Sequence, residues 1–370
     1  MLMAVLMLFV VRGASAQECF EYDDDGHTII TGLTVFGKNA QELTIPASVK
    51  TVKAGAFDGG KVQTLTINGG NPLFESSVLS AVNSSLASID VGSGMSAGNI
   101  KTMLNSLGNR DALETVVIGG FSDDETPTIE WDDLTNELTS AVHVILPATL
   151  VNDQVFGDAK LYGRFTINGE LATTCVNASF VDVDDGSNFL FYIPTSVEDG
   201  NRIKIQRVKY IAGRKGVMIH NTTGTAVNAD LLLDDGTPTA RRTQDSETYT
   251  KNMLVGVTAA TDIKATETKE GTEYTNLILS KGAFHPTSGG TIPANRAYLQ
   301  IPTSVWTAMG AKQLVFNFDD IEAAIDVVTE DTDKSEAMTN LYDLAGRRVS
   351  LSLKSLKGVF IRNGRKAFIK

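Results

Sequence analysis

The sequence predicts a mainly β chain with some α, built from an N-terminal solenoid of stacked repeats, a β-sandwich and a small C-terminal β element. In the first part of the chain, short β-type triplets recur about every 22 to 28 residues. They are followed by segments of alternating apolar residues that Gly, Asn and Asp separate, and Gly turns separate the short strands expected at the C-terminus. At 370 residues the chain exceeds the usual size of one domain. The predicted divisions are a signal peptide at 1–16, the solenoid at 17–162, the sandwich at 163–325, a linker at 326–338 and a β tail at 339–370.

The N-terminal segment has the pattern of a secretory signal peptide. An apolar run extends from Met1 to Val11, and Ala14, Ser15 and Ala16 form the small-residue site that signal peptidase reads. The run is shorter than the about 20 apolar residues of a membrane-spanning helix, and later apolar runs are broken by Gly, Asp or Asn. We expect cleavage near Ala16 and a mature chain without a membrane span, secreted or held at the outer cell surface.

The recurring triplets are the basis of the solenoid prediction. They are Leu43–Ile45, Leu65–Ile67, Ser88–Asp90, Val116–Ile118 and Val144–Leu146. Their spacing lies in the range of leucine-rich repeats. A unit of that length cannot bury its apolar face alone, so successive units are expected to stack.

Two of the units carry a longer shared pattern. Leu43–Val49 leads to Phe57, and Val144–Leu150 leads to Phe156; in each, a strand triplet is followed by Pro, which ends the hydrogen-bonding run. The pattern resembles the BspA-like leucine-rich repeat of bacterial surface antigens, which reads as a strand, I-P-x-S-V and then A-F. Residues 96–108 separately predict a helix, because their apolar residues share one helical face, and a second short helix is expected at Trp131–Leu138.

Seven alternating segments predict the sandwich. They are Phe189–Ile193, Arg202–Ile211, Gly216–His220, Met253–Val257, Tyr274–Leu279, Arg296–Ile301 and Gln313–Phe318. No helical pattern of useful length is evident among them. Four phrases resemble an accessory module of exported proteins from gut and oral Bacteroidetes, a module that implies no activity. The phrases are Leu171–Cys175, Ile211–Val217, Asn252–Gly256 and Thr291–Leu299.

The C-terminal tail is predicted to form three short strands. They lie within Asn340–Val349, Gly358–Gly364 and Lys366–Lys370, after an acidic, Thr-rich linker. The tail resembles the C-terminal element of many Bacteroidetes exported proteins, and longer relatives of that element act as sorting signals for type IX secretion. The resemblance implies passage across the outer membrane, although this tail lacks part of the sorting signal.

The ionisable residues do not form a recognisable catalytic motif. Each of the four histidines, His27, His143, His220 and His285, is isolated from the others, and the chain lacks H-E-x-x-H, a Cys pair at zinc spacing, G-x-S-x-G, a Walker sequence and a dinucleotide fingerprint. We therefore expect no enzyme activity, no cofactor and no metal site. The acidic segment Asp182–Asn188 has oxygen ligands at alternating positions and a Gly, as a calcium loop has, but its register is wrong and no Glu follows at the twelfth position. A hairpin turn at Asp-Gly accounts for it more simply.

The two cysteines, Cys19 and Cys175, are a candidate disulfide. In an oxidising compartment a bridge closing so long a loop would stabilise the chain by about 4 to 5 kcal/mol. Alternatively, Cys175 is a buried residue in a strand, because cysteine is among the most buried residue types.

These patterns favour a non-catalytic protein of the cell surface that binds an unknown protein or glycan ligand. The net charge of −12 at pH 7 argues against a nucleic-acid partner, whose phosphates require a basic face. If the solenoid is the binding part, the outward strand positions Thr44, Thr66 and Asp90 are the candidate ligand-binding residues of its concave face. Two alternatives stay open: a secreted hydrolase acting on polysaccharide or peptide, and a calcium-stabilised structural adhesin.

Overall fold

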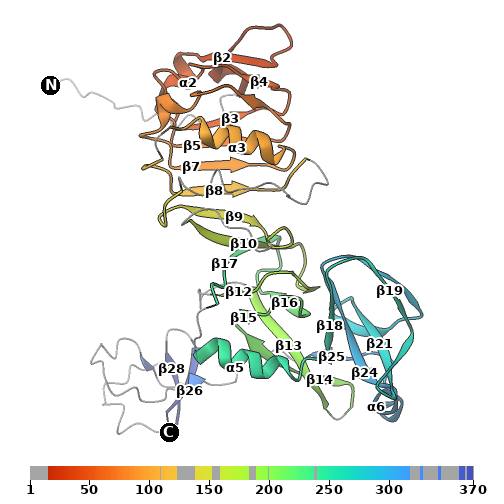
Figure 1. The fold of residues 1–370 in the computed structure, drawn as a ribbon. Helices are drawn as coiled ribbons and strands as arrows, with labels where there is room; N and C mark the ends of the chain where they lie inside the picture. Colours follow the sequence, from red (N-terminus) through yellow and green to blue (C-terminus); the bar gives the residue numbers. More distant parts are fainter. Residues whose placement is uncertain are drawn as a thin grey trace, which may run out of the picture.

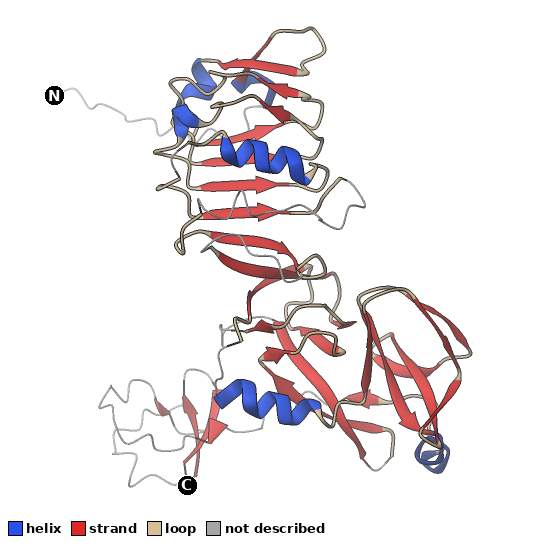
Figure 2. Cartoon of the chain, in the orientation of Figure 1, coloured by secondary structure: helices blue, strands red, loops and turns tan. Residues whose placement is uncertain are grey.

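The computed structural model confirms that the chain is mainly β (Figures 1 and 2). It describes residues 16–108, 110–122, 138–151, 159–182, 189–198, 200–236, 240–316, 326–327, 341–342, 358–362 and 365–369. Apart from the single residues Ala16, Leu138 and Asp182, the expected signal peptide, the second helix at Trp131–Leu138 and the turn at Asp182–Asn188 lie outside these residues, as does most of the linker.

All five repeat triplets lie in strands of one nine-stranded sheet. The strands from the repeats are β3 (Glu42–Ile45), β5 (Thr64–Ile67), β7 (Ser88–Val91), β8 (Thr115–Ile118) and β9 (His143–Pro147). Each pairs in parallel with the next, and β10 (Lys160–Ile167) adds a sixth parallel strand beside β9. We call these six strands the parallel stack; it forms the upper part of Figure 1.

The alternation of apolar and polar residues decides which face of the stack is buried. One inward row is fully or nearly fully buried and is aligned across all six strands by the pairing register. Its members are Leu43, Leu65, Ile89, Val116, Val144 and Leu161. The intervening residues of each strand point to the opposite, outward face.

A second set of elements covers the inward face. It contains the four-stranded sheet β1 (Phe20–Tyr22), β2 (Ile29–Leu33), β4 (Thr51–Val52) and β6 (Leu73–Phe74), then the 3-10 helix η1 (Ser80–Val82) and helix α3 (Ala97–Asn105). Helix α3 confirms the helix expected at 96–108: the Ser96 hydroxyl caps its start, and Ile100, Met103 and Leu104 are buried. The helix contacts β6, so it continues the covering layer where the repeats become longer.

Short helices α1 (Ala16–Cys19) and α2 (Val35–Asn39) lie at the N-terminal end, where α1 contacts β3, the edge strand of the nine-stranded sheet. Helix α2 begins after Thr34, whose hydroxyl accepts a hydrogen bond from the Gly37 N–H. Phe36 on this helix is 69% exposed. This end of the stack therefore carries a large apolar side chain that contributes little to the core.

The nine-stranded sheet continues past the repeats. Strand β10 also pairs antiparallel with β17 (Val227–Leu233), and β12 (Phe180–Val181) and β15 (Tyr210–Ile211) extend the sheet further. The division expected after residue 162 thus falls inside β10. A side chain at Gly163 would collide with the Phe180 ring, so glycine allows this aromatic residue to pack directly over β10.

Two further sheets complete the lower part of Figure 1. The middle sheet contains β11 (Leu171–Thr174), β16 (Val217–Asn221), β13 (Phe189–Glu198), β14 (Arg202–Val208) and β25 (Val315–Phe316). The outer sheet contains β18 (Leu254–Val257), β24 (Arg296–Pro302), β21 (Thr272–Ser280), β20 (Thr266–Lys269) and β22 (Ala283–Pro286), beside the ribbon of β19 (Thr261–Lys264) and β23 (Gly289–Ile292). Every one of the seven expected segments contains a strand.

The middle sheet is buried on both of its faces. Along β13, Phe189, Phe191 and Ile193 belong to the large core that the parallel stack also uses, whereas Leu190 and Tyr192 belong to a second core shared with the outer sheet. A strand buried on both faces reads as a continuous apolar run rather than an alternating one, which explains the sequence of β13. The first core therefore runs without interruption from the repeats into the middle sheet.

Helix α5 (Ala240–Tyr249) was not expected, because no apolar pattern marks it in a polar segment. A buried carboxylate is one of its attachments, beside Tyr249, which belongs to the first core, and Thr248, which accepts a hydrogen bond from Gln206. Asp245 is 1% exposed and accepts hydrogen bonds from the backbone N–H groups of Lys209 and Tyr210, at 2.8 and 2.9 Å. The helix thus fastens to the edge strand β15 through a polar contact that hydropathy does not reveal.

Replacing this carboxylate is expected to destabilise the protein. Asp245→Ala leaves two backbone donors without their acceptor, and each unsatisfied buried donor costs about 1–3 kcal/mol. Urea unfolding should therefore show a free energy of unfolding lower by about 2 kcal/mol or more. Glu247→Ala, an exposed change on the same helix, is the control and should leave it within about 0.5 kcal/mol. Equal stability of the two variants would contradict the role given to Asp245.

The C-terminal tail forms a sheet of four strands within the described residues. Strands β27 (Leu341–Tyr342), β28 (Gly358–Arg362) and β29 (Arg365–Ile369) pair antiparallel, as the three-strand prediction requires. Strand β26 (Asp326–Val327) adds in parallel to β29. The first two residues of the expected linker therefore belong to this sheet.

Candidate functional site

The outward face of the parallel stack brings the three candidate residues together. Thr44 pairs with Thr66 and Thr66 with Asp90 in the strand register, so their side chains form one row across β3, β5 and β7. The same row continues through Val117 and Ile145. Along the stack, the outward row thus changes from hydroxyl and carboxylate groups to apolar ones.

An aromatic pair stands where the row reaches β10. Tyr162 is the row's next member, and its ring lies 5.0 Å from the ring of His143 on β9, at an interplanar angle of 48°. Both side chains are half-buried. Their rings form a tilted aromatic platform that adjoins Ile145.

A charged pair lies next to the aromatic platform. Arg164 on β10 donates two hydrogen bonds to Asp230 on β17, from Nε to Oδ1 at 2.7 Å and from Nη2 to Oδ2 at 2.8 Å. The hydrogen bond to Asp230 raises the pKa of the Arg164 guanidinium, and the charges of Asp230 and Asp90 raise it further. These two residues are 66 positions apart, and the pairing of β10 with β17 brings them together.

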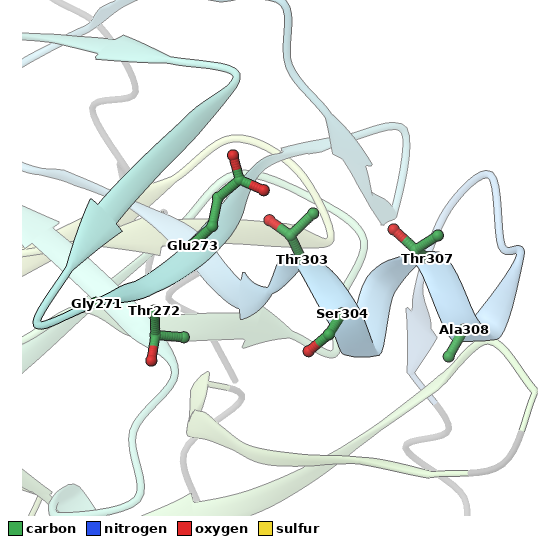
Figure 3. A pocket seen from close by; sticks show the side chains of 7 residues that line it. All are labelled: Gly271, Thr272, Glu273, Thr303, Ser304, Thr307 and Ala308. Atoms are coloured by element: carbon green, nitrogen blue, oxygen red, sulfur yellow. The ribbon is translucent and has the colours of Figure 1, made fainter.

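A second candidate place is an open hollow of about 710 Å³ beside helix α6 (Thr303–Met309). Figure 3 shows the side chains of Glu273, Thr303 and Thr307 on one side of the ribbon there. Its lining is completed by Gly271, Thr272, Ser304 and Ala308. The hollow contains hydroxyl groups and one carboxylate, without a histidine, cysteine or second carboxylate among its lining residues.

The histidines occupy four separate places. His27 follows β1, and its ring centroid lies 4.6 Å from that of Tyr22 at a tilt of 45°. His143 is on β9, His220 is on β16 and His285 is on β22. Among the described residues, no group of three or more His, Cys, Asp or Glu side chains could hold a metal ion.

The acidic residues Asp23, Asp24 and Asp25 lie in a turn that side-chain hydrogen bonds stabilise. The Asp24 carboxylate accepts hydrogen bonds from the N–H groups of Thr28 and Ile29 and from the Thr28 hydroxyl, at 2.8 to 2.9 Å. These bonds close the connection between β1 and β2.

Cys19 and Cys175 are both free and buried, so the candidate disulfide is absent from this structure. Cys19 directly precedes β1, which pairs with β2 at the N-terminal end of the stack, whereas Cys175 packs against Gly256 on β18 in the outer sheet (Figure 1). The fold therefore places the two thiols in distant parts of the molecule. Burial raises the pKa of Cys175 to about 11 and also raises the pKa of Cys19.

The free thiols give a direct prediction. Because the thiolate is the reactive form, a pKa of about 11 leaves only about one Cys175 thiol in a thousand ionised at pH 8. Native protein should therefore react slowly with iodoacetamide, faster as pH rises, and both thiols should react fully in urea. A reducing agent should leave the melting temperature unchanged. A melting temperature lowered by reductant would show that a disulfide forms after all.

The residues near β10 were absent from the candidates drawn from the sequence. The sequence predicts His143 only as an isolated histidine and gives no site role to Tyr162, Arg164 or Asp230. The one usable signal was the alternation in Lys160–Ile167, which places Tyr162 and Arg164 on the same face.

Comparison of the chain with family models, curated proteins and solved structures finds no match in any of the three. Within the described residues, no helix has the length and apolar character needed to cross a membrane.

Proposed function

We propose that this chain is an exported, non-catalytic protein of the cell surface that binds a ligand on the outward face of its parallel stack. The observation that carries the proposal is the alignment of Thr44, Thr66 and Asp90 with the aromatic and charged groups near β10. Side chains repeated in register along parallel strands present an extended surface suited to a long ligand.

The module assignments belong to the same proposal. The parallel stack is a leucine-rich-repeat-like solenoid of the BspA-like kind, the middle and outer sheets are a β-sandwich, and the C-terminal sheet is a secretion element. Support comes from the register of the repeat strands, from the core shared by the two facing sheets and from the sequence resemblances. The signal pattern before residue 17 and the tail resemblance support export in a Bacteroidetes bacterium.

The test is binding of the purified chain, without residues 1–16, to an array of glycans, mucins and matrix proteins, followed by product analysis of every hit. Saturable binding that leaves the ligand chemically intact is the expected result. A cleaved ligand would contradict the non-catalytic part of the proposal and would favour a secreted hydrolase. A melting temperature raised by calcium and lowered by a chelator would instead favour the calcium-stabilised adhesin.

A further inference from the structure

The cluster around β10 has unused capacity for hydrogen bonding. Arg164 has five N–H donors, of which two bind Asp230 and three remain. The Asp230 carboxylate has further acceptor sites beyond those two hydrogen bonds. Neither the Tyr162 hydroxyl nor the His143 ring nitrogens have a hydrogen-bond partner in the part of the chain that the structure describes. The exposed fractions of the Arg164 and Asp230 side chains are 27% and 30%, so solvent and ligands reach them.

The cluster is also electrically balanced. On the outward face of β7 to β10 and β17, the negative charges of Asp90 and Asp230 equal in number the positive charges of Lys160 and Arg164. The strongest positive group is already neutralised by a bidentate carboxylate. The surface therefore attracts neither a polyanion nor a polycation, and its charge matches a neutral ligand.

The apolar part of the cluster adds aromatic and aliphatic contact area. The ring of Tyr162 lies beside Ile145, which neighbours Val117, and both aliphatic residues are half-buried on the outward face. Since neighbouring strands are about 4.8 Å apart, the distance from Asp90 on β7 to Tyr162 on β10 is about 14 Å. A ligand that uses the whole row must be longer than a single small ring and must combine apolar faces with hydrogen-bonding groups, as a chain of sugars does.

We propose that the His143, Tyr162, Arg164 and Asp230 cluster binds a neutral polysaccharide, with the two rings against apolar sugar faces and the Arg164–Asp230 pair hydrogen-bonded to neighbouring hydroxyls. This inference rests on the proposed binding function and specifies its site and ligand class. Amphipathic rings suit such a ligand because they offer apolar area with little loss of conformational entropy. A peptide would instead favour a free sheet edge or an apolar groove.

The test compares variants of the full chain without residues 1–16. The probes are neutral glucans, mannans and xylans, with heparin, polygalacturonate, mucin and matrix proteins beside them. Tyr162→Ala should weaken binding to a neutral polysaccharide by at least about tenfold, whereas Tyr162→Phe, which keeps the ring, should stay within about threefold. Tyr274→Ala, on the outer sheet, is the matched control and should bind as the parent does. Melting temperatures identify any variant that fails to fold.

The outcomes separate the two proposals. Neutral polysaccharide bound by the parent and lost in Tyr162→Ala supports the inference. Binding only to heparin, to mucin or to a matrix protein, or neutral binding that Tyr162→Ala leaves unchanged, overturns the inference while the proposed binding function stands. No saturable binding to any probe counts against both.

Discussion

A chain that stops at residue 162 is expected not to fold into a cooperatively melting unit. The cut falls inside β10 and removes Phe165, Phe180 and Phe191, all buried in the core that the parallel stack shares. Each buried aromatic side chain contributes several kcal/mol to stability, and the net stability of a domain is only about 5–15 kcal/mol. Circular dichroism on heating should show no sharp transition for residues 17–162.

The matched control is residues 17–316, which keep the three large sheets and lack the tail. This chain should melt in one cooperative transition. A sharp transition for 17–162 at a temperature close to that of 17–316 would contradict the shared core and would support an independent repeat domain.

Replacing Phe191 by Ala is expected to lower the free energy of unfolding by about 3–5 kcal/mol. Phe191 is 1% exposed on β13, and its ring packs edge to face on Phe165 of β10 at 5.5 Å. Phe165 packs in the same manner on Phe180 at 5.4 Å, so the substitution opens a cavity where three strands meet. Urea titration followed by both tryptophan fluorescence and circular dichroism measures the change.

Phe36→Ala is the matched control, because Phe36 is 69% exposed and its loss should change stability by no more than about 0.5 kcal/mol. Both probes should shift together in Phe191→Ala, because β13 contributes to both cores and Trp306 packs against the second of them. A shift seen by only one probe would indicate two independently unfolding cores.

The parts of the fold that the sequence predicts are those with a regular period. Triplets such as Leu65–Ile67 alternate inward and outward residues and recur about every 22 to 28 residues, and their strands pair as stacking requires. The start of helix α3 was predictable for a similar reason, because Ser96 precedes an apolar helical face.

The parts that the sequence did not predict depend on distant pairing. Helix α5 is a polar segment attached by hydrogen bonds of Asp245 and Thr248 and by the buried Tyr249, and such mixed contacts leave no apolar periodic pattern. Strand β10 was divided between two modules because the repeat period ends there, although the strand pairs with both β9 and β17. Sequence spacing cannot show that β17 follows β10 in the sheet.

The candidate site likewise has one part that the sequence predicts and one part that depends on distant pairing. Thr44, Thr66 and Asp90 were predictable as one outward row, because they occupy equivalent positions in successive repeats. The Arg164–Asp230 pair was not predictable, because its residues come from strands on either side of the expected domain boundary.

Hydroxyl-radical footprinting of the chain with and without its bound ligand tests most directly whether the outward face is the binding surface. Tyr162 and His143 report on the parallel stack, and Trp306 and Met309 report on helix α6, the helix that also contributes Thr303, Ser304, Thr307 and Ala308 to the hollow shown in Figure 3. We expect the ligand to protect Tyr162 and His143 from oxidation and to leave Trp306 and Met309 unchanged. Protection confined to Trp306 and Met309 would contradict the account and would place the ligand beside α6.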